Sequence, residues 1–455
     1  MEQIDEEKIF DVLEASEKPS EQRLREILGK AEEKKGLELC EVAELLNVKD
    51  AGMLELMFAT SHKIRNEIYG NRLVFFAPLY ISNYCVNDCA YCGFHCSNRK
   101  MKRKKLTLEE IEEQTRCLIR MGHKRLLLEA GEDPINNPID YIVDAIRTIY
   151  ETKEGNGEIR RVNVNIAATT TENYRKLKRA GIGTYQLFQE TFHRETYEKL
   201  HKGPKRDYER QITAHARAFA AGIDDLGIGV LFGLYDYKFE TLALISYAQW
   251  MDMKFGVGPH TISVPRFCPA PTVNLELPYR VDDTDFLKII SVLRLAVPYT
   301  GMIISTRESP EIRAKAFEIG ITQASAGSST SPGGYGKEES SDAQFELHDH
   351  RSVEEVLESV IAQGYLPSFC TACYRSGRTG DRFMELAKSG NIQFLCKPNA
   401  ILTFKEFLLD YASPKLRAAG EKLIKKEVSE VADEIREELI RRLRRIELGE
   451  RDLFF

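Results

Sequence analysis

The sequence predicts an α/β fold built around a closed (β/α)8 TIM barrel, and two observations support this prediction. Between residues 73 and 325, short β-branched or aromatic runs alternate with charged, amphipathic stretches long enough to form helices. Such alternation is typical of parallel strand pairing, and eight repeats over this length favour a closed barrel. The rival fold is an open doubly wound sheet, which would carry a G-x-G-x-x-G fingerprint after its first strand; none follows that strand here.

Three segments are expected along the chain. Residues 1–70 have apolar positions three and four apart, which predicts an N-terminal helical cap. Residues 71–336 are expected to form the barrel, and residues 337–455 a mainly helical C-terminal domain that ends in a charged helical tail. The eight expected barrel strands are 73–79, 125–129, 162–166, 184–188, 227–231, 260–264, 301–305 and 321–325.

Composition narrows the functional class. The chain has 455 residues, of which 43% are hydrophobic and 29% charged, and this excludes collagen-like, disordered and coiled-coil proteins. A net charge of −6 gives no electrostatic case for binding nucleic acid. The N-terminus is acidic where a secretory signal would be basic, and no run of about eighteen apolar residues occurs. We therefore expect a cytoplasmic protein without a membrane partner.

Six of the ten cysteines form two compact clusters, which in a reducing compartment indicates metal binding. Cys85, Cys89 and Cys92 have C-x3-C-x2-C spacing just after the first expected strand, at the barrel end where such enzymes place their chemistry. Three thiolates can ligate three irons of a cubane cluster and leave the fourth iron open. The alternatives are a zinc site, which needs a fourth ligand, or cysteines packed in the core by chance.

The second cluster is a C-x2-C pair, Cys370 and Cys373, followed by Cys396. Such pairs are common zinc ligands, and His348 or His350 would complete a zinc site. No fourth cysteine or histidine follows the triad within reach in sequence. An iron-sulfur cluster with one open position therefore fits this triad better than zinc.

His260 and Arg266 lie at opposite ends of the sixth expected strand. Six residues at 3.3 Å each separate them by about 20 Å. His260 would therefore sit at the bottom of the barrel, where a lone histidine is structural unless a metal site lies beneath.

The ends of the last two expected strands carry candidates for binding an amino-acid substrate. Arg307 offers a planar fork to a carboxylate, and Ser325, close to a glycine, lets a ligand approach the backbone. Arg266 is the rival carboxylate clamp. Tyr80 would line the same pocket or pack within the barrel.

The first cysteine loop, with Tyr91 before its last cysteine, resembles that of the radical S-adenosylmethionine (SAM) enzymes. The resemblance implies that residues 130–132 hold the methionine amino group of SAM, although Ala130 departs from the usual glycine and a plain strand-to-helix turn is the alternative. It also implies that Glu190 bonds a ribose hydroxyl and that Arg210 faces the SAM carboxylate. The residues expected to contact SAM are Tyr91, Ala130, Gly131, Glu132, Glu190 and Arg210.

Over nearly its whole length, the chain closely resembles the radical SAM tyrosine lyases of FeFe-hydrogenase maturation. The segments that carry the resemblance are YCVNDCAYCGF (84–94), LEAGEDP (128–134), SVPR (263–266), SAGS (325–328) and CTACYRSGRTG (370–380), together with Cys396. A related family, the 2-iminoacetate synthases of thiazole biosynthesis, shares the barrel motifs but lacks the C-terminal triad. This family is therefore the alternative enzyme.

The resemblance implies a specific reaction. SAM is cleaved to a 5′-deoxyadenosyl radical, which takes hydrogen from L-tyrosine, and the Cα–Cβ bond then breaks. The products are p-cresol and dehydroglycine, and the latter gives carbon monoxide and cyanide for an iron precursor of the hydrogenase H-cluster.

The implied cofactors are SAM, a SAM-binding 4Fe-4S cluster on the first triad, and an auxiliary 4Fe-4S cluster with an additional iron on the second. His260 then becomes a ligand for that iron. The implied partners are reduced ferredoxin or flavodoxin, which the basic run 99–105 would attract, and other hydrogenase maturation proteins. A hypothesis of another class is a cluster carrier or scaffold that binds maturation partners without turnover.

Overall fold

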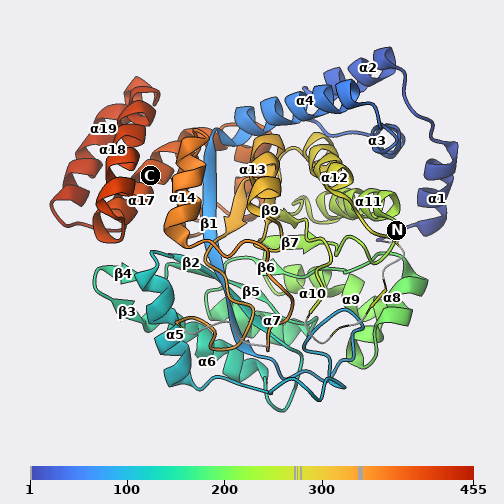
Figure 1. Ribbon diagram of the computed structural model, residues 1–455, viewed down its shortest axis with the longest axis horizontal. Helices are drawn as coiled ribbons and strands as arrows, with labels where there is room; N and C mark the ends of the chain where they lie inside the picture. The colour runs from blue at the N-terminus through green and yellow to red at the C-terminus, as the bar shows by residue number, and fades with distance from the viewer. Residues whose placement is uncertain (1–2, 271–272, 274, 277–278, 337–341) are drawn as a thin grey trace.

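A closed parallel barrel of eight strands forms the centre of the computed structural model, which describes residues 3–270, 273, 275–276, 279–336 and 342–455 (Figure 1). The strands run in the order β10-β9-β8-β7-β6-β5-β2-β1, and pairing of β1 with β10 closes the barrel. The predicted (β/α)8 barrel is therefore confirmed. Its strands are β1 (Arg72–Ser82), β2 (Arg125–Ala130), β5 (Arg161–Asn165), β6 (Tyr185–Gln186), β7 (Leu226–Gly229), β8 (Thr261–Ser263), β9 (Gly301–Ile304) and β10 (Gln323–Ser325).

Strand β1 is long enough to serve both ends of the barrel. Its later residues, from Ala77 on, pair with β2, and Val74 to Phe76 pair with β10. Its first residues, Arg72 to Val74, pair in parallel with β11 (Leu366–Ser368), a strand that the sequence did not indicate. This pairing attaches the C-terminal part of the chain to the barrel at the N-terminal ends of the strands.

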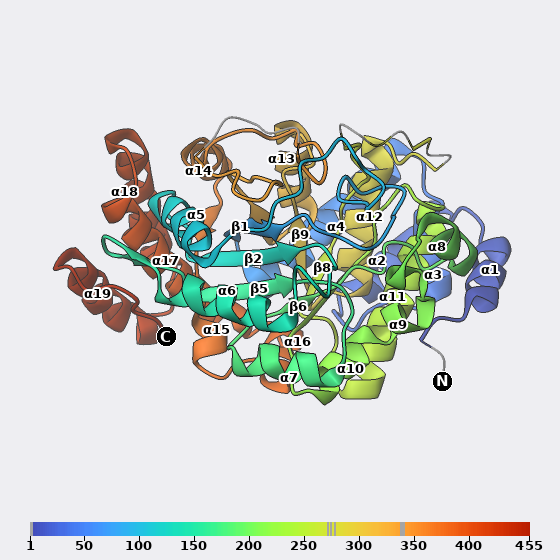
Figure 2. The same cartoon turned by 90° about the horizontal axis from the view of Figure 1, so that it is seen from below.

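Helices cover the outside of the barrel (Figure 2). Helix α5 shows why they form where they do. Thr107 and Glu110 cap its start reciprocally, and its apolar residues, such as Ile111 and Leu118, are buried against the barrel. The helices between barrel strands are α5 (Leu108–Arg120), α6 (Ile139–Glu151), α7 (Thr171–Arg179), α8 (Arg194–Leu200), η1 (Pro204–Arg206), α9 (Tyr208–Ile212), α10 (Ala214–Ala220), α11 (Tyr237–Phe255), α12 (Asp283–Ala296) and α13 (Pro310–Ile319), with a small hairpin of β3 (Lys153–Glu154) and β4 (Gly157–Glu158) after α6.

The two terminal groups of helices lie on different sides of the barrel (Figure 1). The N-terminal group is α1 (Glu6–Ala15), α2 (Glu21–Ala31), α3 (Leu39–Leu46) and α4 (Ala51–Tyr69). As a group, these helices pack against α11, α12 and α13. The C-terminal group is α14 (Val353–Ala362), α15 (Ala372–Arg375), α16 (Gly380–Lys388), α17 (Ile392–Asp410), α18 (Pro414–Ser429) and α19 (Asp433–Glu447). Within the described part of the chain, no helix is both long and apolar enough to cross a membrane.

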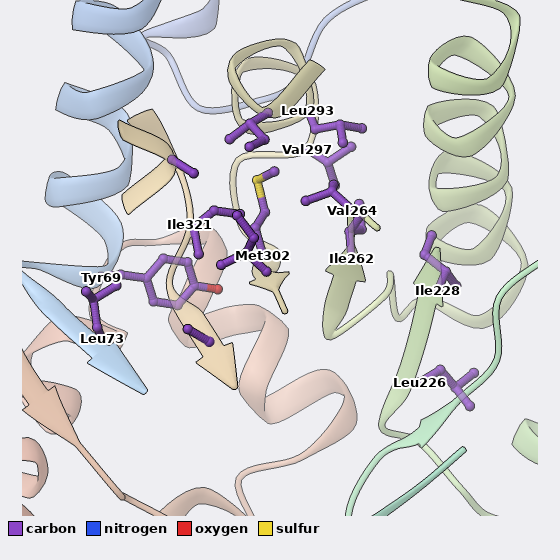
Figure 3. Close-up of a cluster of buried hydrophobic side chains, with 14 of the residues drawn as sticks. Tyr69, Leu73, Leu226, Ile228, Ile262, Val264, Leu293, Val297, Met302 and Ile321 are labelled. Atoms are coloured by element: carbon purple, nitrogen blue, oxygen red, sulfur yellow. The ribbon is translucent and has the colours of Figure 1, made fainter. Parts of the chain in front are cut away.

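Side chains alternate between the two faces of the barrel strands. Ile228, Ile262 and Met302 are register partners on β7, β8 and β9, and all three are buried on the outer face. Figure 3 shows Leu293 and Val297, at the end of α12, beside Met302. The residues that alternate with this row face the barrel interior, and several are small, which leaves room for ligands at the centre.

Candidate active site and second metal centre

The first cysteine triad lines a large cavity at the C-terminal ends of the barrel strands. Cys85, Cys89 and Cys92 follow β1 and all contribute to its wall as free thiols. Asn87 Nδ2 lies 3.8 Å from Cys85 Sγ, and Gln344 Nε2 lies 3.7 Å from Cys92 Sγ. Burial raises the pKa of Cys92 to about 11 and that of Cys89 further. Such thiols need a bound cation to stay deprotonated, which fits a metal cluster.

Among the described residues, no group of three or more His, Cys, Asp or Glu side chains is placed to hold a single metal ion. A cubane cluster takes one thiolate per iron, whereas a tetrahedral zinc site brings four ligands to one ion.

Residues 130–132 tie the end of β2 to the cysteine loop. Gly131 N donates to Ser82 O at 3.1 Å, and Val86 N donates to Glu132 O at 2.7 Å. A Cβ on Gly131 would lie 2.4 Å from the carbonyl oxygen of Tyr84, so no side chain fits there. Ala130, Gly131 and Glu132 all line the same cavity as the cysteines.

Glu132 and Glu190, the two carboxylates predicted to contact SAM, each have a cationic partner. Glu132 forms an ion pair with Arg210 at 2.5 Å, and Arg210 itself lines a neighbouring cavity that shares residues 130–132. Glu190 binds Lys205 at 2.7 Å and has a φ of +70°, an unusual backbone conformation for a residue other than glycine. Burial acts to raise the pKa of Glu190, but the Lys205 ammonium outweighs it and holds that pKa below its usual value.

Tyr91 faces the same region. It lines the cavity, and its hydroxyl lies 2.8 Å from His201 Nε2.

Three of the four predicted substrate residues line the cavity. Arg307, Ser325 and Tyr80 do so, and Ser325 Oγ accepts a hydrogen bond from Thr306 N at 3.2 Å. Arg266 lies outside the cavity wall, because its guanidinium forms ion pairs with Glu308 and Asp283. Of the two rival clamps, Arg307 is therefore the one placed to reach a ligand.

Sequence reasoning missed other residues of this wall. Glu129 on β2 and Asn165 on β5 face the cavity, and Asn165 Nδ2 donates to Glu129 Oε2 at 3.3 Å. Strand alternation from Leu127 would have pointed Glu129 inward. Gln344 and Phe345 reach the cavity from a distant loop: Tyr80 Oη donates to Gln344 Oε1 at 2.8 Å, and the Arg307 guanidinium lies 3.3 Å from the Phe345 ring centre. No local sequence signal predicts that contact.

The second triad lines a separate cavity at the N-terminal ends of the strands. Cys370 follows β11, Cys373 lies in α15 and Cys396 lies in α17. All three line this cavity together with His260, which immediately precedes β8. The structure therefore places His260 beside the triad, at the bottom of the barrel.

His260 is held as a neutral imidazole. Its Nδ1 lies 3.5 Å from Asp225 Oδ2, and its Nε2 lies 3.3 Å from the Tyr374 hydroxyl. Burial lowers the pKa of His260 to about 4. A neutral imidazole is the form that binds metals.

The histidines of the zinc alternative lie elsewhere. His348 N donates to Thr306 O at 3.0 Å, at the C-terminal end of β9, and neither His348 nor His350 lines the cavity of the second triad. Neither is therefore a fourth ligand of that triad.

The second cavity has a cationic wall. Arg72 and Arg125 are each only 7% exposed and line it with the thiols. Nε and Nη1 of Arg72, and Nε of Arg125, have no hydrogen-bond partner among the described residues. Buried N–H groups of this kind normally find an acceptor. The residues thus fit an anionic, sulfur-rich group such as an iron-sulfur cluster.

The two cavities occupy adjacent layers of the barrel interior. Phe76, Leu127 and Ile303 form a small buried apolar cluster that lines the first cavity. Val74, Arg125 and Gly301, two residues earlier on the same strands, line the second. The floor of the first cavity and the second cavity are therefore lined by adjacent inward-facing layers, with the apolar layer on the side of the first cavity.

The basic run 99–105 has two parts. Arg103 is half-buried and donates to the carbonyl oxygens of Asn83 and Phe94, which ties down the cysteine loop. Arg99, Lys100 and Lys102 are exposed.

Comparisons with known proteins agree with this geometry. Residues 79–246 match the Radical SAM superfamily, and residues 263–366 match the Biotin and Thiamin Synthesis associated domain. The chain is 32% identical to 2-iminoacetate synthase of Escherichia coli over 71% of this chain and 84% of that protein. It is 30% identical to the [FeFe] hydrogenase maturase subunit HydE of Thermotoga maritima over 62% of this chain and 76% of that protein.

Solved structures extend the likeness to the whole chain. The crystal structure of HydG, a maturase of the [FeFe]-hydrogenase, superposes with a TM-score of 0.97 at 57% identity and covers 100% of both chains. HydG from Carboxydothermus hydrogenoformans superposes with a TM-score of 0.85 at 38% identity, over 96% of this chain and 97% of that chain.

Proposed function

The chain belongs to the radical SAM superfamily, in the family that includes 2-iminoacetate synthase and the maturase HydG, and from this premise we propose that it is a tyrosine lyase of FeFe-hydrogenase maturation. It cleaves the Cα–Cβ bond of L-tyrosine to p-cresol and dehydroglycine. Dehydroglycine is then converted to carbon monoxide and cyanide for an iron precursor of the H-cluster.

One observation carries this proposal: a second thiol triad, with His260, in a cavity one layer below the first. We call the cavity at the C-terminal ends of the strands the upper cavity and the one at their N-terminal ends the lower cavity. A 2-iminoacetate synthase needs only the upper cavity. A carrier that binds clusters without turnover needs no substrate cavity, yet the upper cavity presents Arg307 and Ser325 in addition to its thiols.

The upper cavity would hold SAM and a 4Fe-4S cluster through Cys85, Cys89 and Cys92. When bound and reduced by ferredoxin or flavodoxin, they supply the radical chemistry that removes a hydrogen atom from the substrate. The protein's part is to position the reactants. Glu132 and Arg210 face one end of SAM, Glu190 binds its ribose, and Arg307 with Ser325 and Tyr80 orients the amino acid. The apolar layer of Phe76, Leu127 and Ile303 keeps the floor of the cavity dry.

The lower cavity would hold the auxiliary 4Fe-4S cluster through Cys370, Cys373 and Cys396, with His260 as a neutral ligand for the additional iron. The Arg72 N–H groups that have no partner in the described part of the chain would be available to its sulfur atoms. Products made in the upper cavity would travel to this site through the barrel interior, protected from water.

A product assay tests the proposal. Anaerobically reconstituted protein is reduced with dithionite in the presence of SAM and L-tyrosine, and 5′-deoxyadenosine, p-cresol and carbon monoxide are measured together. We expect all three. p-Cresol without carbon monoxide would indicate a 2-iminoacetate synthase, and absence of 5′-deoxyadenosine would indicate a carrier.

A double variant tests the division between the sites. Replacement of Cys370 and Cys373 by alanine should abolish carbon monoxide and leave p-cresol formation intact. Equal loss of both products would contradict two separate sites.

A further inference from the structure

Glu129 is a half-buried carboxyl in the upper cavity to which the proposed reaction assigns no role. It lies near the end of β2, in register with Tyr80 on β1, and its side chain lines the cavity. Its hydrogen bond to Asn165, at 3.3 Å, is with an uncharged group. No lysine, arginine or histidine forms an ion pair with Glu129 in the described part of the chain. A carboxylate in this position lacks the counter-charge that burial demands.

Arg307 presents the opposite charge to the same space. Its guanidinium lines the cavity and lies against the Phe345 ring, and among the described residues no carboxylate is within ion-pairing distance of it. Burial raises the pKa of Glu129 to about 8, and the positive charge of Arg307 opposes that rise. The two side chains are therefore near enough to influence each other. They do not form an ion pair with each other, so each is free to bind a ligand.

The other acidic groups of the cavity are already engaged. Glu132 is paired with Arg210, and Glu190 with Lys205. Glu129 is thus the carboxyl of this wall that lacks a cationic partner, and Arg307 supplies the guanidinium that lacks an anionic one.

The Arg307 guanidinium and the Glu129 carboxyl, which lack partners of opposite charge among the described residues, match the two ends of a zwitterion. We propose that Glu129 binds the ammonium group of an α-amino acid whose carboxylate is bound by Arg307, and that this pair selects for zwitterionic substrates. The assignment rests on the proposed function only for the identity of that amino acid, L-tyrosine. The ligand ammonium provides the counter-charge that lets Glu129 ionise. A ligand without the ammonium leaves Glu129 protonated and without a salt bridge, and a ligand without the carboxylate leaves Arg307 unpaired.

Four probes test the inference through binding to the reconstituted, SAM-loaded protein, measured by calorimetry. L-Tyrosine has all the groups, 3-(4-hydroxyphenyl)propanoate lacks the ammonium, tyramine lacks the carboxylate, and L-phenylalanine lacks the hydroxyl. Glu129→Gln preserves the shape of the side chain and removes its charge. We expect this variant to weaken binding of L-tyrosine and L-phenylalanine by about 10- to 100-fold, and binding of 3-(4-hydroxyphenyl)propanoate hardly at all.

Other outcomes would overturn the inference. If the loss in Glu129→Gln persists with 3-(4-hydroxyphenyl)propanoate and disappears with L-phenylalanine, Glu129 serves the phenol hydroxyl. An equal loss with every probe, or a lowered iron content, would make its role structural. Arg307→Gln is the matched variant, and it should spare tyramine while weakening the other three probes.

The proposed function can fail separately. If wild-type protein forms no p-cresol, the tyrosine assignment is wrong. In that case, a panel of L-amino acids and their deaminated analogues, bound to wild type and to Glu129→Gln, still decides whether the wall selects a zwitterion.

Discussion

At the scale of single residues, the lower cavity is defined by charge as much as by sulfur. Arg72 has two nitrogen atoms without a partner among the described residues and contributes to the wall that holds Cys396. Hydrogen bonds to cluster sulfur and nearby positive charge both favour the reduced form of an iron-sulfur cluster.

Arg72→Met should therefore lower the reduction potential of the auxiliary cluster. A hydrogen bond to a charged group contributes about 1.5–3 kcal/mol, and 59 mV corresponds to 1.4 kcal/mol for one electron, so a shift of about 60 mV or more is expected. The measurement is a redox titration followed by electron paramagnetic resonance. Arg72→Lys keeps the charge and should show a smaller shift, whereas an unchanged potential in the Met variant would contradict the electrostatic role.

His260→Ala should remove the additional iron and leave both cubanes in place, because His260 lines the cavity of the second triad and is proposed to supply a nitrogen ligand to that iron alone. Iron analysis should show a loss of about one iron per chain with unchanged cluster spectra. Tyr374→Phe is the control, since it removes only the hydroxyl that lies 3.3 Å from the imidazole. A normal iron content in His260→Ala would contradict the assignment.

Site residues that belong to a local sequence pattern could be predicted, whereas residues that only the fold brings together could not. Both triads were predicted from the spacing of their cysteines, and Arg307 and Ser325 from their places at the ends of the last two expected strands. Gln344 reaches the upper cavity from a distant loop, and the hydrogen bond that Tyr80 donates to it joins residues 264 positions apart in the sequence. Arg72 lies just before the expected first strand, 73–79, and only the pairing of β1 with β11 places it beside Cys396.

At the scale of elements, the eight barrel strands were predictable because each is bounded by a helix and carries its own apolar pattern. Their lengths were not. β6 has two residues where five were expected: only Tyr185 and Gln186 have register partners on the neighbouring strands, although Leu187 N still donates to Gly227 O at 3.0 Å. Strand β11 was missed because it has three residues, one of them Pro367, and such a segment is strand-like only as an edge.

The loop from β1 to α5 combines the first triad with an exposed basic patch, Arg99, Lys100 and Lys102. If an acidic electron donor docks on this patch, replacing all three with glutamate should slow reduction by ferredoxin or flavodoxin and weaken the salt dependence of the rate. Reduction by dithionite should be unaffected, since Arg103, which ties the loop down, is kept. The same change at the exposed Lys422 and Lys425 of α18 is the control. Equal rates in both variants would exclude docking at the loop.

At the scale of the whole molecule, buried titratable groups set the dependence of stability on pH. Glu129 and Glu240 have pKa values raised by burial to about 8 from an ordinary 4.5. Between these values the folded chain binds more protons than the unfolded chain, so the free energy of unfolding falls as the pH rises. Burial lowers the pKa of His123 and His215 to about 4 from 6.5, and these groups reduce stability as the pH falls through that window. Below about pH 6.5 the two effects oppose each other, and between about 6.5 and 8 only the carboxyls act. These groups therefore make the free energy of unfolding fall as the pH rises through neutrality.

Glu240→Gln tests how much of the loss of stability above neutral pH comes from ionisation of Glu240. Glu240 is fully buried and accepts a hydrogen bond from Phe192 N at 2.9 Å, which the glutamine oxygen can also accept. Between pH 6.5 and 8.5, ionisation of Glu240 should cost wild type about 2 kcal/mol, at 1.36 kcal/mol per pH unit up to the folded pKa. Urea unfolding at both values should show that loss in wild type and in the control Glu434→Gln on the exposed face of α19, and a smaller loss in Glu240→Gln. An equal loss of the free energy of unfolding in all three proteins would mean that Glu240 is already ionised at neutral pH. The loss of stability above neutral pH would then have another origin.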